Sequence, residues 1–445
     1  MKSFPISFVN RLVVQFGNER SEQILEALDK PPITSIRYNP FKVKANIAEP
    51  KIKWCNEGQL LQERPSFTLD PLFHAGVYYV QEAGSMILME SLKPHVDFNR
   101  RLIALDLCAA PGGKATHLLS HLSAESVLIA NEVIKSRIAP LVHNLARWGR
   151  SNYIITNTDP EKLEQSSLKF DLIIVDAPCS GEGLFRKTNH AIEEWSEENC
   201  KLCSSRQKKI LSAAYNMLSE GGILYYSTCT LNAEENELNL VWLKNQFGLE
   251  FPNMSHLDKF GFHSLSTQGI KAFYILPDKH TSEPYFFSVM KKKGSLTEQA
   301  FKDKRENNLS TSVNKLIKTD YSNHVCAFDN HYFLRNKITQ TILKDRLLNA
   351  KIVKAGSNIG EQKGNDFIPD PSFALSNAIQ NEAFPKCSLN LEYSLQFLRK
   401  QPVPIDLFEP GWNLVQFQNV NLGFVKHVGS RINNYYPVQW RIENL

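Results

Sequence analysis

Apolar and polar positions alternate in blocks along the middle of the chain, from about residue 100 to residue 250. Short apolar runs that suit buried strands occupy residues 102–107, 127–131, 153–156, 170–175 and 223–227. Longer amphipathic stretches expected to be helices occupy residues 114–122, 135–148, 199–218 and 234–247. Near-continuous apolar strands separated by helices predict a parallel sheet with helices on both faces, a doubly wound α/β fold.

The flanking regions follow other patterns. Residues 1–30 have apolar positions near helical spacing before Pro31 and Pro32, which predicts helix. Beyond residue 248, two extra strands are expected at residues 272–276 and 285–290, and the C-terminal part combines short strands and turns with a helix at residues 391–400. We therefore divide the chain into an N-terminal α+β region, an α/β domain, a connector and a C-terminal module, at residues 1–100, 101–290, 291–318 and 319–445.

Composition narrows the class of protein. The chain has 445 residues, 42% of them hydrophobic, and no apolar stretch long enough to cross a membrane. The N-terminal apolar stretch meets Arg11 too early for a signal peptide. We expect a soluble, cytoplasmic, monomeric protein without a membrane partner.

The net charge of +5 is mild, but positive charge is concentrated in one segment. Residues 271–318 hold ten Lys and Arg against five acidic residues, an excess equal to that of the whole chain. Such a run can be a solvated linker or can contact a polyanion, and composition leaves both open. Arg37 and the Arg186-Lys187 pair are also candidates for phosphate contacts.

The eight cysteines are too dilute for a disulfide scaffold, so we expect free thiols. Cys200 and Cys203 have the spacing of half a zinc site, but no second pair lies nearby, which favours two cysteines on a helix face. The twelve histidines show no H-E-x-x-H spacing. We expect no metal.

The first apolar strand leads from Asp106 through DLCAAPGGK into a helix. Gly112 and Gly113 allow a close backbone approach to a ligand at the positive end of that helix. Cys108 and Ala115 stand where a P-loop needs Gly and Ser or Thr, and the G-x-G-x-x-G dinucleotide motif is missing. A smaller nucleoside ligand is favoured, and S-adenosylmethionine fits.

Two more acids follow strands of the same predicted sheet. Glu132 follows the second strand, where an acid commonly binds ribose hydroxyls, and Asp159 follows the third, within reach of an adenine amino group. Each could instead cap a helix. Their register with the glycine loop favours the ligand interpretation.

Asp176, Cys179 and Cys229 all lie just beyond strand ends, at the edge where such sheets bind ligands. Together they suit methylation of a pyrimidine at carbon 5. A thiolate must first add to carbon 6, a carboxyl group can protonate ring nitrogen 3, and a base must then remove the carbon-5 proton. The spacing does not decide which cysteine attacks.

The segments DLCAAPGGK, NEVIKSR, DLIIVDAPCSGEG and YSTCTLNAEENE resemble the RNA 5-methylcytosine methyltransferases of the NOL1/NOP2/Sun family. The resemblance implies a Rossmann-like catalytic domain with Cys229 as the nucleophile and Cys179 as the base that releases the product. It also implies that S-adenosylmethionine is bound by Cys108, Ala109, Ala110, Pro111, Gly112, Gly113, Lys114, Glu132, Asp159 and Asp176.

The C-terminal segments AGSNIGEQKGNDFIPDPSFALS and GWNLVQFQNVNLGFVKHVGSRINNYYPVQWRI resemble the PUA-like RNA-binding part of the RsmF-type branch, which methylates 16S ribosomal RNA. This implies small-subunit ribosomal RNA as the partner. RNA contacts are expected from a cluster of cations and aromatic rings, Lys426, Arg431, Arg441, Tyr435, Tyr436 and Trp440. The alternatives are a transfer-RNA enzyme, or a non-catalytic ribosome-assembly factor with the same fold.

Overall fold

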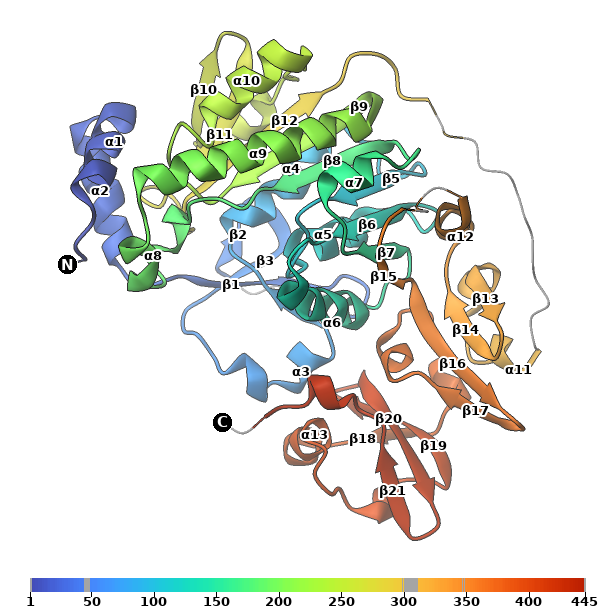
Figure 1. The fold of residues 1–445 in the computed structure, drawn as a ribbon. Helices are drawn as coiled ribbons and strands as arrows, with labels where there is room; N and C mark the ends of the chain where they lie inside the picture. The colour runs from blue at the N-terminus through green and yellow to red at the C-terminus, as the bar shows by residue number, and fades with distance from the viewer. Residues whose placement is uncertain are drawn as a thin grey trace.

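A mixed sheet forms the centre of the molecule (Figure 1). The computed structural model describes residues 2–43, 49–297, 299, 311–345, 347 and 349–443. Within them, the sheet has the strand order β10-β11-β12-β9-β8-β5-β6-β7-β15. Its parallel strands are β5 (Ile103–Asp106), β6 (Val127–Asn131), β7 (Tyr153–Thr156), β8 (Phe170–Asp176) and β9 (Leu218–Thr228). The parallel sheet predicted from the apolar runs is confirmed.

Antiparallel strands extend both edges of this sheet. Beside β9 lie β12 (Tyr285–Lys291), β11 (Ile270–Ile275) and β10 (His263–Thr267), and beside β7 lies β15 (Ile352–Ala355). Strands β11 and β12 are the two extra strands that the sequence predicts. Strands β10 and β15 were not predicted, because HSLST and IVKA are short and partly polar and their pairing depends on distant segments.

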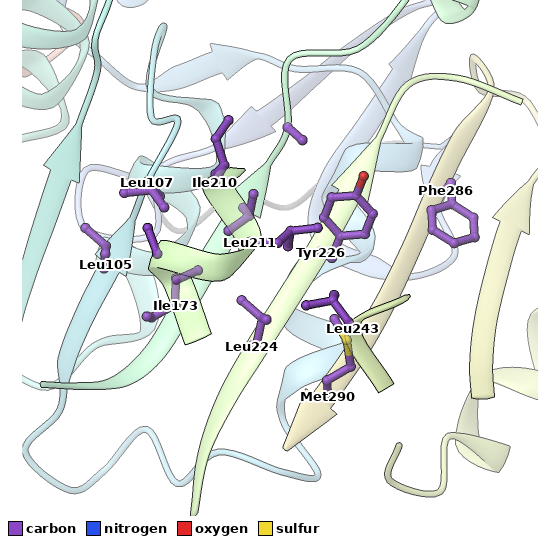
Figure 2. Close-up of a cluster of buried hydrophobic side chains, with 14 of the residues drawn as sticks. Leu105, Leu107, Ile173, Ile210, Leu211, Leu224, Tyr226, Leu243, Phe286 and Met290 are labelled. Carbon is purple, nitrogen blue, oxygen red and sulfur yellow. The ribbon is translucent and has the colours of Figure 1, made fainter. Parts of the chain in front are cut away.

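Helices pack on both faces of the sheet, as a doubly wound fold requires. The side chains alternate: Leu105 and Ile173 belong to one apolar cluster, and Ala104 and Leu172 to the other. The first cluster includes residues of α1 (Ile6–Phe16), α2 (Asn18–Asp29), α9 (Glu197–Met217) and α10 (Glu237–Phe247), among other helices. Figure 2 shows part of it, with Ile210 and Leu211 of α9 and Leu243 of α10 beside the sheet. The second includes residues of α5 (Gly113–His121) and α6 (Ile138–Trp148).

Most helix predictions agree with the structure within a few residues, but the N-terminal one does not. Residues 1–30 form two helices, because Gly17 between them has φ +81°, a conformation that interrupts an α-helix. The segment at residues 135–148 begins with a short 3-10 turn before α6.

The N-terminal region adds an antiparallel sheet beside the catalytic fold. Its order is β2 (Lys51–Ile52), β3 (Cys55–Leu61), β1 (Thr34–Tyr38) and β4 (Tyr78–Val80). The short helix α3 (Pro71–His74) lies between β3 and β4 in the chain, and α4 (Leu88–Leu92) follows β4. Ile52, Trp54 and Met86 share an apolar cluster with Ala115 and Leu118, so this sheet packs on α5.

The C-terminal part contains two small sheets within the described residues, as well as β15. The first consists of β13 (Val325–Phe328), β14 (His331–Leu334), β16 (Ser357–Lys363) and β17 (Asp366–Pro369), near α11 (Thr311–Asn314) and α12 (Lys337–Asp345). The second consists of β18 (Lys386–Ser388), β19 (Gly411–Phe417), β20 (Val420–Val428) and β21 (Arg431–Asn434). The predicted C-terminal helix is α13 (Leu391–Leu398).

The last sheet is anchored to the N-terminal region and not only to its neighbour in sequence. Phe67 and Tyr78 share an apolar cluster with Phe397 and Val415, and Figure 1 shows α13 close to α3. The Trp440 ring stacks on His143 of α6, with ring centroids 4.5 Å apart. Packing therefore joins the C-terminal sheet to the catalytic fold.

Three further expectations can be compared with the described chain. All eight cysteines are free, as predicted. No helix among the described residues combines the length and apolar character needed to cross a membrane. Much of the basic connector, including Lys302, Lys304 and Arg305, lies outside the described residues.

Candidate active site

Two adjoining clefts open at the carboxyl ends of the parallel strands, the edge at which this architecture binds ligands. The larger cleft, of about 590 Å³, includes Glu132 and Asp159 in its lining. The smaller cleft, of about 470 Å³, includes Asp106 and Lys114. Asp176 and Cys229 line both clefts, so the predicted catalytic residues lie where the two meet.

The glycine loop between β5 and α5 forms the wall of the smaller cleft. Its lining residues are Cys108, Ala109, Ala110, Pro111, Gly113 and Lys114. Gly112 does not line the cleft. It has φ +113°, and a Cβ there would lie 3.2 Å from Leu145, so Gly112 allows the turn against α6.

Donors from three other elements hold this loop by its carbonyl oxygens. Arg137 donates to the Ala110 carbonyl at 2.5 Å, Asn144 to the Pro111 carbonyl at 2.7 Å and Arg37 to the Gly113 carbonyl at 3.2 Å. The loop is therefore fixed before any ligand binds.

The two acids predicted from the strand ends lie in the larger cleft. Glu132 accepts a hydrogen bond from the Ile134 amide, while its Oε2 has no hydrogen bond among the described groups and lies 3.5 Å from Arg137. Asp159 accepts from the Glu161 amide and caps α7 (Pro160–Glu164). The capping interpretation of Asp159 therefore holds together with its place in the cleft.

Asp106 is a functional candidate that the sequence analysis passed over. It is 1% exposed, and neither carboxyl oxygen has a well-formed hydrogen bond within the described chain. Burial and the Asp176 charge raise the pKa of Asp106 to about 7, although Lys114 and the Cys108 amide lower it somewhat. Such a group favours a cationic partner. An acid that ends an apolar strand was its only signal in the sequence.

Asp176, at the end of β8, forms an ion pair across the site. Lys114 Nζ lies 2.7 Å from Asp176 Oδ2, and Ser227 Oγ donates to Oδ1 at 2.7 Å. Burial by itself would lower the pKa of Lys114, but Asp176 with Tyr225 and Asp106 raises it above its ordinary value. Lys114 therefore stays charged, 5.1 Å from the Tyr285 ring centroid.

The two predicted cysteines face each other. Cys179 Sγ and Cys229 Sγ lie 3.0 Å apart, in the loops that follow the neighbouring strands β8 and β9. The hydrogen bond to Cys229, burial and the charge of Cys229 raise the pKa of Cys179 well above its ordinary value. In the resting site Cys179 therefore keeps its proton.

Buried carboxylates hold these two loops together. Glu235 accepts from the Ser180 amide at 3.1 Å, from Gln207 at 2.7 Å and from Asn232 at 2.6 Å. Glu182 accepts from the Leu231 amide at 2.6 Å. The sequence analysis missed both residues, since nothing in AEENE distinguishes Glu235 from its neighbours.

Gly183 completes the contact between the loops. Its amide donates to the Cys229 carbonyl at 2.6 Å, and a Cβ at this position would lie 2.5 Å from the same oxygen. Only glycine allows this approach, which places the backbone of Cys229 against the loop that carries Cys179.

The candidate phosphate-binding cations divide into two groups. Arg37 is fully buried and donates to Gln81 and Thr116, and Arg186 is buried beside Glu283, so neither can reach a phosphate at the surface. Lys187 lines the smaller cleft, and Arg206 and Lys209 of α9 line the larger one. Of the predicted phosphate contacts, Lys187 is exposed at the site, whereas Arg37 and Arg186 are buried.

The predicted RNA-contacting tail is only partly free. Tyr436 is 2% exposed and lies in the core, so its ring offers no free face for a base, and Trp440 is partly buried with one face stacked on His143. Lys426 lies 3.3 Å from Asp366. Arg431 and Arg441 are exposed.

This sheet order, with a glycine loop after β5 and ligand-lining acids after the next strands, defines a Rossmann-like methyltransferase. A solved methyltransferase homologue from Pyrococcus horikoshii is 30% identical with a TM-score of 0.54, over 65% of this chain and 96% of that one. A structure named NSun6 from Pyrococcus horikoshii with SFG has a TM-score of 0.56 at 21% identity, over 66% of this chain and 100% of that one.

Sequence comparison then identifies the family. The family described as 16S rRNA methyltransferase RsmB/F matches residues 91–291, the RsmF N-terminal domain matches residues 4–83 and the RsmF PUA domain matches residues 384–442. The chain belongs to the RsmB/F family of methyltransferases. The resemblance, the fold class and the enzyme class expected from the sequence are confirmed.

Named relatives extend over the whole chain. The Ribosomal RNA small subunit methyltransferase F of Salmonella typhi is 29% identical over 98% of this chain and 96% of its own length. The protein of the same name from Pectobacterium atrosepticum is 34% identical over 62% of this chain and 60% of its own length.

Proposed function

We propose that this methyltransferase transfers a methyl group from S-adenosylmethionine to carbon 5 of a cytosine in 16S ribosomal RNA. One observation carries the chemistry: the Cys179 and Cys229 sulfurs lie 3.0 Å apart, and Cys229 lines both clefts together with Asp176, the partner of Lys114. The names of the family and of its relatives support the choice of RNA.

The residues around the clefts fit S-adenosylmethionine. Asp106 offers a buried carboxyl group without a well-formed hydrogen bond, which suits the ammonium of the methionine moiety, and Glu132 Oε2 suits a ribose hydroxyl. Asp159 lines the same cleft as Glu132 and suits an adenine amino group. The glycine loop from Cys108 to Lys114, which follows β5, forms the wall of the neighbouring smaller cleft. When bound, the cofactor supplies an electrophilic methyl group on a sulfonium.

The chain's own groups then activate the base. The Cys229 thiolate forms a bond to carbon 6 of the cytosine. Asp176, positioned by Lys114 and Ser227, takes up a proton from solvent when the base binds and delivers it to ring nitrogen 3. The negative charge of the thiolate passes into the ring and is neutralised by that proton. Carbon 5 becomes nucleophilic and gains the methyl group.

Release requires a base, and Cys179 becomes one after the addition. The largest cause that raises its pKa is the hydrogen bond to Cys229. When Cys229 is bonded to carbon 6 that cause disappears, so the pKa of Cys179 falls and its thiol can lose its proton to solvent. The Cys179 thiolate then takes the carbon-5 proton, the bond from Cys229 to carbon 6 breaks, and nitrogen 3 returns its proton to Asp176.

RNA approach is supported by exposed cations at both ends of the site. Lys187 lines the smaller cleft, and Arg206 and Lys209 line the larger one. Arg431 and Arg441 are exposed on the C-terminal sheet, which the PUA-domain match covers. We place the enzyme in the cytoplasm, where ribosomal RNA and a reducing environment for the thiols coexist.

The decisive experiment separates the two thiols. Cys229→Ala is expected to abolish methyl transfer and adduct formation, whereas Cys179→Ala is expected to accumulate a covalent protein–RNA adduct on denaturing gels. Cys326→Ala, which removes a free thiol remote from the clefts, serves as the control. Full activity in Cys229→Ala would refute the mechanism.

A second measurement tests the substrate. Bisulfite sequencing of 16S ribosomal RNA and transfer RNA from cells that lack the gene should show the loss of a methylated cytosine in ribosomal RNA only. If the methylated cytosine is lost from transfer RNA only, the enzyme carries out the same reaction on transfer RNA and not on ribosomal RNA. No loss together with no cofactor binding would support the non-catalytic assembly factor.

A further inference from the structure

A group of metal-ligating side chains lies far in sequence from the thiol pair, between the N-terminal sheet and α5. Cys55 and Glu57 are two residues apart on β3, and His117 belongs to α5. One ligand atom from each of the three lies within 4.8 Å of the other two. Cys55 and His117 are buried, while Glu57 is partly exposed.

The imidazole of His117 makes no hydrogen bond to the described residues. It is 1% exposed, and neither ring nitrogen has a hydrogen-bond partner among the described residues. A buried polar group without a partner is costly, so such groups are rare unless something binds them. His121, one turn further along α5, also has a buried Nε2 without a partner, and its ring centroid is 5.6 Å from that of His117.

We propose that Cys55, Glu57 and His117 bind one Zn²⁺ ion at the junction of β3 and α5, with His121 as the nearest candidate for the fourth ligand. Sulfur, nitrogen and carboxylate oxygen in a four-coordinate set are the donors that Zn²⁺ takes in proteins. The sequence predicted no metal, because these ligands come from segments about sixty residues apart with no local spacing motif.

One pair of ligands already has a spacing that suits a tetrahedral ion. Cys55 Sγ lies 3.7 Å from Glu57 Oε2. Zinc–sulfur and zinc–oxygen bonds of ordinary length place two such ligands about 3.5 Å apart. The ligand atom of His117 lies within 4.8 Å of both, so binding would draw the imidazole toward this pair.

Charge is balanced when the thiol loses its proton. Binding releases the Cys55 proton to solvent, and the thiolate and the Glu57 carboxylate then neutralise the two charges of the ion. Imidazole binds metals through an unprotonated ring nitrogen, and His117 has two buried ring nitrogens without a partner among the described residues. Arg37 and Lys93 are the nearby cations, and Arg37 is already engaged by Gln81 and Thr116.

The position indicates a structural role. The metal would clamp β3 to α5, the helix whose first turn carries Gly113 and Lys114 of the glycine loop. It would tie the N-terminal sheet to the cofactor-facing wall of the catalytic fold. The site itself does not depend on the proposed RNA substrate.

The first experiment measures the metal directly in the full-length, untagged protein. Elemental analysis after purification without chelator is expected to find about one zinc per chain. After the metal is removed, titration with Co²⁺ should produce thiolate charge-transfer absorption at a one-to-one ratio. The Cys179→Ser/Cys229→Ser double variant must retain this signal, since that pair is the other thiol cluster that could bind cobalt.

Variants then assign the ligands. Cys55→Ser and His117→Gln should lose the zinc and the cobalt absorption, and Glu57→Gln, a mild change at a partly exposed position, should weaken zinc binding at least tenfold. Cys387→Ser removes another buried thiol and should keep full metal content. If the wild-type chain contains no zinc and shows no cobalt–thiolate absorption, the site does not exist. If Glu57→Gln and Cys55→Ser both bind normally, these residues are not ligands.

Discussion

The two sides of the active-site cleft differ in how their buried polar atoms are satisfied. On the thiol side, Glu235 accepts from three donors, and Gly183 and Glu182 bind the backbone around Cys229. On the cofactor side, Asp106 lacks a well-formed hydrogen bond and Glu132 Oε2 has none within the described chain.

This difference separates what the protein holds by itself from what it leaves for a ligand. Unpaired buried acceptors are costly, so those that persist are expected where a ligand supplies the donors. Internally satisfied networks, in contrast, fix reacting groups before substrate arrives. The protein therefore positions the thiols by itself, whereas Asp106 and Glu132 have acceptor oxygens that the ammonium and hydroxyl groups of a ligand can satisfy.

Among variants that leave both cysteines in place, the largest effect on kcat is expected from Glu235→Gln on the thiol side. Glutamine offers one acceptor oxygen where Glu235 uses two, so its amide would oppose the donors of Gln207 or Asn232. Hydrogen bonds to a charged group contribute about 1.5–3 kcal/mol, and their loss here would misplace the thiols. We therefore expect kcat to fall about 10- to 100-fold, while KM for the cofactor stays unchanged. Single-turnover methylation and adduct formation would measure it.

The matched control is Glu234→Gln at the neighbouring position. Glu234 is partly exposed and its side chain forms an ion pair with Arg11 of α1. Its kcat should stay within about twofold of wild type. Equal losses in the two variants would show that the Glu235 network does not position the thiols.

On the cofactor side, Asp106→Asn should raise KM for S-adenosylmethionine about 10- to 100-fold while kcat at saturation changes less. The amide cannot form the ion pair that the buried carboxylate offers to an ammonium group. Isothermal titration would give the affinity directly. Asp97→Asn, an exposed acid on the segment before β5, should bind as the wild type does.

The pH dependence of binding follows from the same carboxyl group. Because the pKa of Asp106 is raised to about 7, its binding-competent carboxylate form is lost as pH falls through 7, and affinity should drop about tenfold between pH 8 and pH 6. Without cofactor the sign reverses: a folded pKa above the unfolded value means that stability decreases as pH rises from about 4 to 7. Asp106→Asn should remove both trends, measured by titration and by thermal unfolding.

The smallest effect is expected from exposed cations at the opening of the larger cleft, because changing them disturbs neither the thiols nor the buried acids. Arg206→Ala should weaken RNA binding about two- to fivefold and reduce the salt dependence of the affinity by about one phosphate contact. Lys201→Ala, an exposed cation of the same helix that does not line the cleft, is the control. Filter binding at several salt concentrations measures both, and an unchanged slope in Arg206→Ala would remove it from the RNA path.

Local pattern accounts for much of the catalytic domain. Strands β6 and β7 have the predicted bounds, because apolar runs of this length between helices have few other structures available. Asp176 and Cys229 were located from the same pattern, since a residue just after a parallel strand must lie at the ligand-binding edge. The nearness of Cys179 follows from the adjacency of β8 and β9.

Other features had no local signal. Glu235 could not be distinguished from Glu234 by sequence, because only the fold turns one inward and the other to the surface. Tyr436 and Trp440 have the composition of an RNA-binding tail, yet Tyr436 is buried against Phe397 and one face of Trp440 is stacked on His143. Strand β15 joins the main sheet from about 200 residues beyond β7.

The sequence by itself determined the doubly wound sheet and the strand ends at which chemistry can occur, because both depend on short-range periodicity and on the invariant geometry of parallel strands. The tertiary structure alone decided which polar atoms are paired, which cysteine keeps the proton and whether Cys55 meets His117. These properties depend on ångström-scale distances and burial between segments far apart in the chain, and no local pattern of residues encodes them.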